Sequence, residues 1–166
     1  MQPLSEKIIR SSFLNASKRE RDSLVLPANF AELDWDRLDF LGWRDPKVPG
    51  IGYVVVYLDA ADEAAGPTAI LLRQSDGMAR SRPQCSWCED VTLPNDVVLF
   101  SARRGGDSGR KGNTIATLVC DNFQCSTNVR KAPPIAYLGF DVEAAIARHI
   151  EALGTHVRGF VREVAG

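Results

Sequence analysis

The sequence predicts an α+β fold in which antiparallel β-hairpins lie between an N-terminal and a C-terminal helix. Three features support this class: two pairs of short β-rich segments, apolar residues at helical spacing near both ends, and four cysteines in two close pairs. The chain has 166 residues, of which 45% are hydrophobic and 25% are charged. It is therefore long and apolar enough to bury one hydrophobic core, and its composition is not that of a disordered protein.

Residues 1–79 are expected to supply an N-terminal helix and a β-hairpin that belong to the same domain as the rest of the chain. Ser5 is a candidate N-cap, and apolar residues follow it at helical spacing. The β-rich segments 53–58 and 68–73 are separated by a loop containing Asp, Ala, Gly and Pro. This arrangement predicts an antiparallel strand pair.

Between this helix and this hairpin, the segment 33–43 mixes aromatic with acidic side chains and shows no clean period, so little regular structure is expected there. The acidic residues of this region lack the glycine and the terminal glutamate of a calcium-binding loop. We interpret them as a solvated acidic face. They are Asp34, Asp36, Asp39 and Asp45.

The second half of the chain contains another predicted hairpin and a long predicted helix. The segments 97–102 and 114–119 are β-rich, and a basic, glycine-rich turn joins them. From Asp141, a candidate N-cap, apolar residues recur every three or four positions almost to the end of the chain, which indicates an amphipathic helix. Gly154 lies inside this helix and marks the position at which a kink or break would occur.

The four cysteines form a C-x₂-C pair, Cys85 and Cys88, and a C-x₄-C pair, Cys120 and Cys125, with 31 residues between the pairs. Two such pairs allow four thiolates to converge on one tetrahedral Zn²⁺ ion. Because all four positions around the ion are then filled by protein, the site is structural rather than catalytic. The alternatives are cysteines buried as small hydrophobic residues and iron in the same cage.

These segments follow one another in the order of a treble-clef zinc finger. The first cysteine pair lies in a loop, the predicted hairpin fills the gap, and the second pair falls where the strand 114–119 ends. Residues 80–166 are therefore expected to form a treble-clef zinc finger with a C-terminal helix. Trp87 and Phe123 lie between the two cysteines of each pair, where they either shield the sulfurs from water or pack as ordinary core residues.

Charge and motif content argue against several function classes. The formal net charge is −1, from 20 Lys and Arg against 21 Asp and Glu, which does not favour a dedicated nucleic-acid or anionic-membrane protein. No run approaches the roughly 20 apolar residues that span a bilayer, and the N-terminus lacks the order of a signal peptide, so we expect a cytoplasmic protein with no membrane partner. No P-loop, nucleophile elbow or zinc-protease motif is present, so we predict neither an enzyme nor a small-molecule substrate.

The middle of the chain is basic, because residues 73–131 contain nine Lys and Arg against six Asp and Glu. Arginine binds carboxylates with two parallel hydrogen bonds and is favoured at interfaces, so an acidic protein surface would suit these side chains. We expect the following residues, near the first cysteine pair and at the tip of the second hairpin, to bind a partner: Arg82, Trp87, Arg103, Arg104, Arg110 and Lys111.

Several segments carry a resemblance to a known family. They read RSRPQCSWC over 80–88, LFSARR over 99–104, GNT over 112–114 and CDNFQCSTNVR over 120–130, and VRGFVREV closes the chain over 157–164. Together they resemble the FBP-type treble-clef zinc-finger family, the elongation factor G-binding proteins. The combination is much more specific than cysteine spacing alone.

The resemblance implies a cytoplasmic bacterial protein that binds elongation factor G, free or on the ribosome, through its zinc-finger domain. In the resistance members of the family, this binding helps the factor to leave a ribosome on which fusidic acid has trapped it. The present sequence differs from those members in offering four cysteines where they use a histidine as one ligand. It is also expected to be too short for their separate N-terminal helical bundle.

The alternative function is that of a ribosome- or RNA-binding zinc protein whose basic hairpin contacts rRNA. In this interpretation the basic side chains follow a phosphate backbone. The residues that would do so are Arg80, Arg82, Arg103, Arg104, Arg110, Lys111, Arg130 and Lys131.

Overall fold

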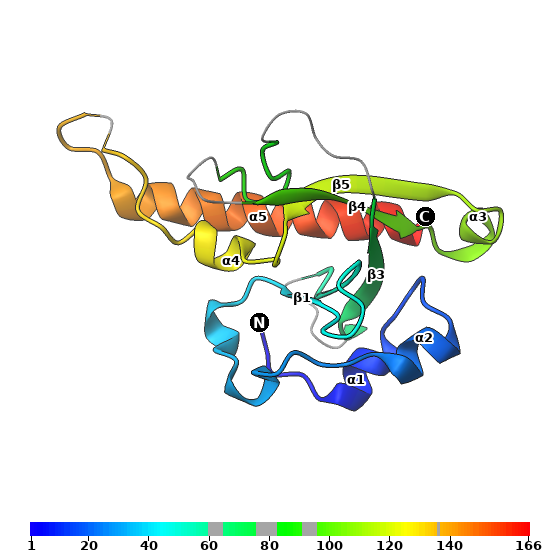
Figure 1. Cartoon of the computed structure of the whole chain (residues 1–166). Helices are drawn as coiled ribbons and strands as arrows, with labels where there is room; N and C mark the ends of the chain where they lie inside the picture. The colour runs from blue at the N-terminus through cyan, green and yellow to red at the C-terminus, as the bar shows by residue number, and fades with distance from the viewer. Residues whose placement is uncertain (60–64, 76–82, 91–95, 136) are drawn as a thin grey trace.

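A five-stranded antiparallel sheet forms the centre of the computed structural model, which describes residues 1–59, 65–75, 83–90, 96–135 and 137–166 (Figure 1). The strands lie in the sheet in the order β1-β2-β3-β4-β5, so each strand pairs with its neighbours in the sequence. The predicted α+β class with antiparallel hairpins is confirmed. The strands are β1 (Leu41–Arg44), β2 (Ile51–Val56), β3 (Thr68–Gln74), β4 (Val97–Arg103) and β5 (Thr114–Cys120).

Short helices precede the sheet and one long helix follows it. The side chain of Ser5 accepts a hydrogen bond from the Ile8 N–H and caps the first helix, as predicted, and Ser17 forms a complete capping box on the second. The helices are α1 (Glu6–Ser11), α2 (Lys18–Ser23), α3 (Gly106–Arg110), α4 (Cys125–Asn128) and α5 (Val142–Ala165), with 3₁₀ turns η1 (Phe30–Glu32) and η2 (Trp35–Arg37).

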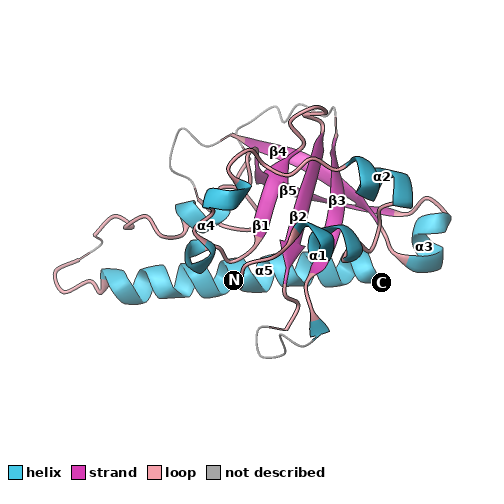
Figure 2. Cartoon of the chain, turned by 90° about the horizontal axis from the view of Figure 1, so that it is seen from below, coloured by secondary structure: helices cyan, strands magenta, loops and turns pink. Residues whose placement is uncertain are grey.

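The N-terminal segment covers one face of β1, β2 and β3 (Figure 2). Ile9 of α1 is fully buried there, and Phe13 forms a bridge to Ala69 of β3. The aromatic rings of Trp43 and Tyr53, a cross-strand pair on this face, lie 5.0 Å apart. The predicted N-terminal helix therefore has a packing role, and it ends earlier than the apolar pattern because Phe13 leaves it to join the sheet.

The acidic residues Asp39 and Asp45 are not part of a solvated face, so that interpretation is wrong for both. Asp45 is 4% exposed and accepts hydrogen bonds from the Tyr53 hydroxyl (2.9 Å) and from the N–H groups of Lys47 and Val48. Asp39 forms a two-pronged ion pair with Arg130, at 2.6 and 3.1 Å. Asp45 thus holds a local turn together and Asp39 joins two distant parts of the chain, because each carboxylate has protein donors in place of water.

The helix α5 packs against the opposite face of the sheet through Leu153, Val157, Val161 and Val164, all of which are buried. Asp141 caps it, as predicted, by accepting a hydrogen bond from the Ala144 N–H at 2.9 Å. The helix continues without a break through Gly154, which lies on its buried side. Packing therefore compensates for the low helix propensity of glycine. None of the described helices is both long enough and apolar enough to cross a bilayer.

The hairpin of β4 and β5 pairs over its whole length, from Val97 opposite Cys120 to Arg103 opposite Thr114. Its tip contains the short helix α3, where the sequence had predicted only a glycine-rich turn. The Gly105 N–H donates to the carbonyl of Val164 at 2.6 Å, and this bond anchors the tip to the end of α5. The two ends of the hairpin are thus held by different elements, the tip by α5 and the base by the cysteine segments.

Two glycines in the sheet make room for Phe123. A Cβ atom at Gly42 of β1 would lie 2.7 Å from the Cβ of Phe123 and from Cε2 of Phe40, and one at Gly52 of β2 would lie 2.6 Å from Cζ of Phe123. Carbon atoms in contact sit about 3.5–4.0 Å apart, so neither position accepts a side chain without movement. The two glycines let the ring of Phe123 rest directly on the backbone of the sheet.

We predict that Gly42→Ala lowers the free energy of unfolding by about 1–3 kcal/mol, because the added methyl group overpacks the contact with Phe123 and Phe40. Urea unfolding of the zinc-saturated protein measures the change. Gly50→Ala is the matched control, since a Cβ at Gly50 meets nothing within 4 Å. Equal stability of the two variants would contradict the proposed close packing at Gly42.

Candidate metal centre

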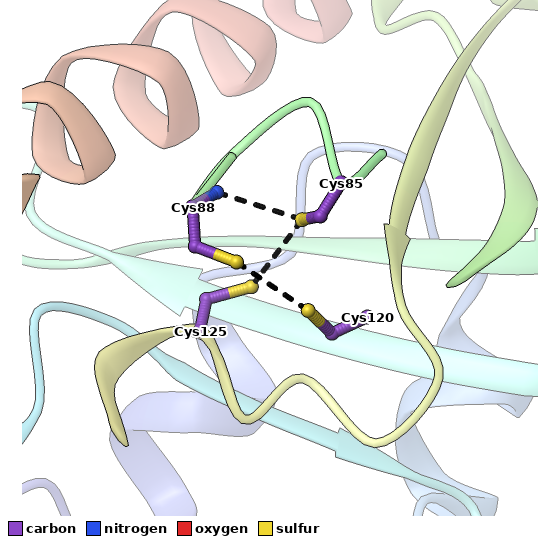
Figure 3. Close-up of side chains that lie close together, drawn as sticks. All are labelled: Cys85, Cys88, Cys120 and Cys125. Atoms are coloured by element: carbon purple, nitrogen blue, oxygen red, sulfur yellow. Dashed lines mark hydrogen bonds between the residues drawn. The ribbon is translucent and has the colours of Figure 1, made fainter. Parts of the chain in front are cut away.

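The structure brings all four cysteines together at the base of the β4–β5 hairpin (Figure 3). Cys85 and Cys88 lie on a turn within residues 83–90, Cys120 is the last residue of β5, and Cys125 is the first residue of α4. Their sulfur atoms all lie within 4.8 Å of one another. The first two ligands lie in a loop, the hairpin follows, and the last ligand lies at the start of a helix. This is the order that the sequence predicted for a treble clef.

The sulfur positions fit a tetrahedral zinc ion. Zinc–thiolate bonds of about 2.3 Å place the corners of a regular tetrahedron about 3.8 Å apart. The Sγ atoms of Cys85 and Cys125 are 3.7 Å apart, and those of Cys88 and Cys120 are 3.5 Å apart. Separations near 2 Å, which would indicate disulfide bonds, do not occur between these pairs, and all four cysteines are free.

Backbone and side-chain donors point at the sulfurs. The Sγ of Cys85 accepts hydrogen bonds from the N–H groups of Trp87 (3.4 Å) and Cys88 (3.5 Å). The Nδ2 of Asn128, which is 7% exposed, lies 3.5 Å from the Sγ of Cys120 and 3.9 Å from that of Cys88. Donors of this kind stabilise the negatively charged thiolate form, which is the form that binds zinc.

The pKa values of the four thiols shift in opposite directions because the thiols interact with one another. The hydrogen bond with Cys120 is the main cause that lowers the pKa of Cys85, whereas the hydrogen bond with the same neighbour is the main cause that raises the pKa of Cys125. Burial adds to the rise at Cys125. Four thiolates at this separation need a central cation to carry negative charge together, which is the electrostatic requirement that Zn²⁺ meets.

Aromatic rings belong to the same core cluster as Cys85, Cys120 and Cys125. Trp87 is 2% exposed and packs edge-on against Phe40 at 5.4 Å, with Phe160 of α5 at 5.8 Å between ring centroids. Phe123, in the loop between the second cysteine pair, has a φ of +56°, which is uncommon for a residue with a side chain. This backbone conformation turns the loop from Cys120 to Cys125 while the ring rests on the glycines of β1 and β2.

Three contacts fix the cysteine segments to the rest of the fold. The Ser86 N–H donates to the carbonyl of Leu118 at 2.8 Å, so the first cysteine turn lies along β5. The Nε of Arg44 donates to the carbonyl of Asp121 at 2.7 Å, and its guanidinium also pairs with the Asp121 carboxylate. The Nδ1 of His156 on α5 lies 3.0 Å from the carbonyl of Trp87. This contact anchors the first cysteine turn to α5.

The structure describes five of the six residues expected to bind a partner, and they differ in their surroundings. Arg82 lies outside the described residues, and the indole of Trp87 is buried and unavailable to a partner in this structure. Arg104 donates to the carbonyl of Glu163 at 2.9 Å, and Arg110 pairs with Asp107. The remaining two, Arg103 and Lys111, are exposed at the hairpin tip and form no ion pair within the part of the chain that the structure describes.

Residues 8–164 match the family described as FBP C-terminal treble-clef zinc-finger. The chain belongs to this family. The match covers nearly the whole sequence, including the stretches before and between the segments that carry the resemblance. Comparisons with curated proteins and with solved structures gave no match. Family membership and the fit of the four sulfurs identify the protein as a zinc-binding module of the treble-clef type.

Asn128 was not singled out from the sequence, although it lies in the segment that carries the family resemblance. Asparagine is common on surfaces and at caps, so its identity alone does not indicate a role beside a metal. Its position three residues after Cys125, one turn further along α4, indicates that its side chain lies on the same face of the helix as this ligand.

We predict that Asn128→Ala weakens zinc retention by about 10–100-fold, because the two thiolates lose their buried side-chain donor. Competition with a chromophoric chelator measures the affinity. Thr127→Ala is the matched control on the same helix, since Thr127 is exposed and neighbours no sulfur among the described contacts. Retention of zinc by the Asn128 variant at the level of the control would exclude this role.

Proposed function

We propose that this chain is a cytoplasmic protein-interaction module that binds elongation factor G, with one Zn²⁺ held by Cys85, Cys88, Cys120 and Cys125. The observation that supports it most strongly is the match over residues 8–164 to the FBP C-terminal treble-clef zinc-finger family. The four-cysteine geometry adds a chemical reason. A zinc ion with four thiolate ligands has no position for water or substrate, so its role is to hold a binding surface in place.

The exposed face of the hairpin tip is the surface that we assign to the partner. Arg103 ends β4 and Lys111 follows α3, and both are exposed. The Gly105–Val164 hydrogen bond and the Arg104 contact with Glu163 attach this tip to α5. Because the base of the hairpin is held by the cysteine cluster and the tip by α5, these cations are presented on a supported scaffold to an acidic surface.

The charge distribution favours a protein partner over rRNA. Four of the eight basic residues that a phosphate-binding surface would use take part in ion pairs within the chain: Arg104, Arg110, Arg130 and Lys131. Arg130 is also largely buried, at 18% side-chain exposure. Of the other four, Arg80 and Arg82 lie outside the described residues, so the described part of the chain offers two exposed cations without an ion pair, Arg103 and Lys111, rather than a row of phosphate contacts.

We predict that protein purified without chelators contains one zinc per chain and that Cys88→Ser loses both the metal and cooperative unfolding of the second half of the chain. Elemental analysis and hydrogen exchange of the amides in the second half of the chain measure the two effects. Thr127→Ala, at an exposed position two residues after the Cys125 ligand, is a control that keeps all four thiols. A Cys88→Ser chain with the parent's zinc content would refute the ligand assignment.

We further predict that Arg103→Ala/Lys111→Ala weakens binding to purified elongation factor G by about 1 kcal/mol and reduces its salt dependence, because exposed cations act mainly through screened attraction. Titrations at two salt concentrations measure both quantities. Arg148→Ala/Lys47→Ala removes the same types of exposed charge and is expected to have no effect, since Arg148 lies in the N-terminal half of α5 whereas the tip is bound to Val164 near the other end.

Capture experiments, in which the protein retains its partners from bacterial lysate with and without nuclease, distinguish binding of elongation factor G from binding of rRNA. Retention of elongation factor G after RNA has been digested agrees with the proposal. Recovery of only rRNA-dependent species would contradict it and favour the RNA-binding alternative.

A further inference from the structure

The strand β5 forms one edge of the sheet, and its outward-facing backbone groups can be identified. The carbonyl of Leu118 accepts a hydrogen bond from Ser86, which lies outside the sheet, so the polar groups of Leu118 point away from β4. In an antiparallel pair, alternate residues of one strand bond to the neighbouring strand. Ala116 and Thr114 therefore share the outward direction of Leu118.

The first cysteine turn covers only part of this edge. Ser86 pairs with Leu118, whereas the N–H and C=O of Ala116 have no hydrogen-bond partner among the described residues. Ala116 and Thr114 are both exposed. An unpaired strand edge of this kind is a template for the backbone of another extended segment.

A groove runs beside this edge. It has a volume of roughly 620 Å³ and lies between β5 and the C-terminal half of α5, with the Ser86–Trp87 turn at one end. Figure 1 shows β5 following α5 over this part of the helix. The helix contributes Gly159 and Phe160, which are half-buried, and His156 and Glu163. A strand edge beside a helix is the arrangement in which added peptide strands are held in several peptide-binding domains.

We propose that an extended segment of the partner protein binds in this groove as a sixth strand, pairing with Thr114 and Ala116 in line with Ser86. This proposal rests on the proposed function, because the segment is assigned to elongation factor G. An apolar side chain of the segment packs against Phe160. A lysine or arginine of the segment lies near Glu163, whose side chain is 63% exposed and whose one ion-pair contact among the described residues, with Arg104, is long at 3.9 Å.

Two variants block the groove from opposite walls. Ala116→Pro removes the outward N–H, and it costs no bond to β4 because that N–H does not take part in the β4–β5 ladder. Ala116→Ser keeps the N–H and is its control. Gly159→Leu fills the groove from α5, where an added Cβ meets nothing within 4 Å. Ala147→Leu places the same side chain at an exposed position of α5 outside the groove and is the second control.

The experiment titrates purified elongation factor G with the parent and the four variants, after zinc content and thermal unfolding have shown that each is folded. We expect Ala116→Pro and Gly159→Leu each to weaken binding about tenfold or more, and both controls to bind like the parent. Hydrogen exchange of the complex is expected to slow at the amide of Ala116. Should Ala116→Pro fail to fold, Gly159→Leu and the exchange rate decide the question.

The outcomes distinguish the groove from the proposed function. In the first outcome, the parent and the groove variants bind the factor equally well, and exchange at Ala116 is unchanged. This result overturns the groove assignment and leaves the proposed function standing. If the parent does not bind the factor, the groove assignment and the proposed function are both overturned. If the parent self-associates through β5 and Ala116→Pro abolishes this dimer, the occupant is a second copy of the chain, and the partner assignment is overturned.

Discussion

Mutual repulsion among four buried thiolates is the constraint on which the second half of the chain depends. Cys85 and Cys125 are fully buried and lie 3.7 Å apart, where two negative charges cannot coexist without a cation between them. The hydrogen bonds from Trp87, Cys88 and Asn128 reduce the charge on individual sulfurs but do not neutralise the four thiolates together. A divalent ion removes the repulsion and converts the same four side chains into a single rigid junction between the first turn, β5 and α4.

This junction is joined to the sheet by shape as well as by charge. Phe123 sits in the loop between two cysteines, and its ring occupies the space left by Gly42 and Gly52. Arg44, the last residue of β1, holds the same loop through the carbonyl and the carboxylate of Asp121. The metal centre and the N-terminal strands therefore form one packed unit, although the cysteines lie entirely in the second half of the sequence.

Local patterns in the sequence were sufficient for the parts of the fold that depend on neighbouring residues. The cysteine spacing, the two hairpins and the cap at Asp141 each involve residues within a few positions of one another or a simple period. The contacts that were missed are long-range: Asp39 with Arg130 and Arg44 with Asp121 lie 91 and 77 residues apart. No periodic pattern reports which distant partner a charged side chain will meet.

The same limit explains the errors at aromatic and glycine positions. Trp87 lies beside basic residues in the sequence, which favoured an interface role, but its indole is enclosed by rings from Phe40 and Phe160. Gly154 has poor helix propensity, yet α5 remains continuous because the sheet packs against that turn. In both cases tertiary packing, which a single sequence does not display, decided the outcome.

The separation of the two cysteine pairs along the chain also sets an order of events during folding. An ion that joined Cys88 to Cys120 in an unfolded chain would have to close a loop of 32 residues, at a considerable cost in chain entropy. Pairing of β4 with β5 begins at Arg103 and Thr114, which are close in sequence, and each further pair draws the two cysteine segments together. We therefore expect metal capture to follow hairpin formation and to stabilise a strand pairing that already exists.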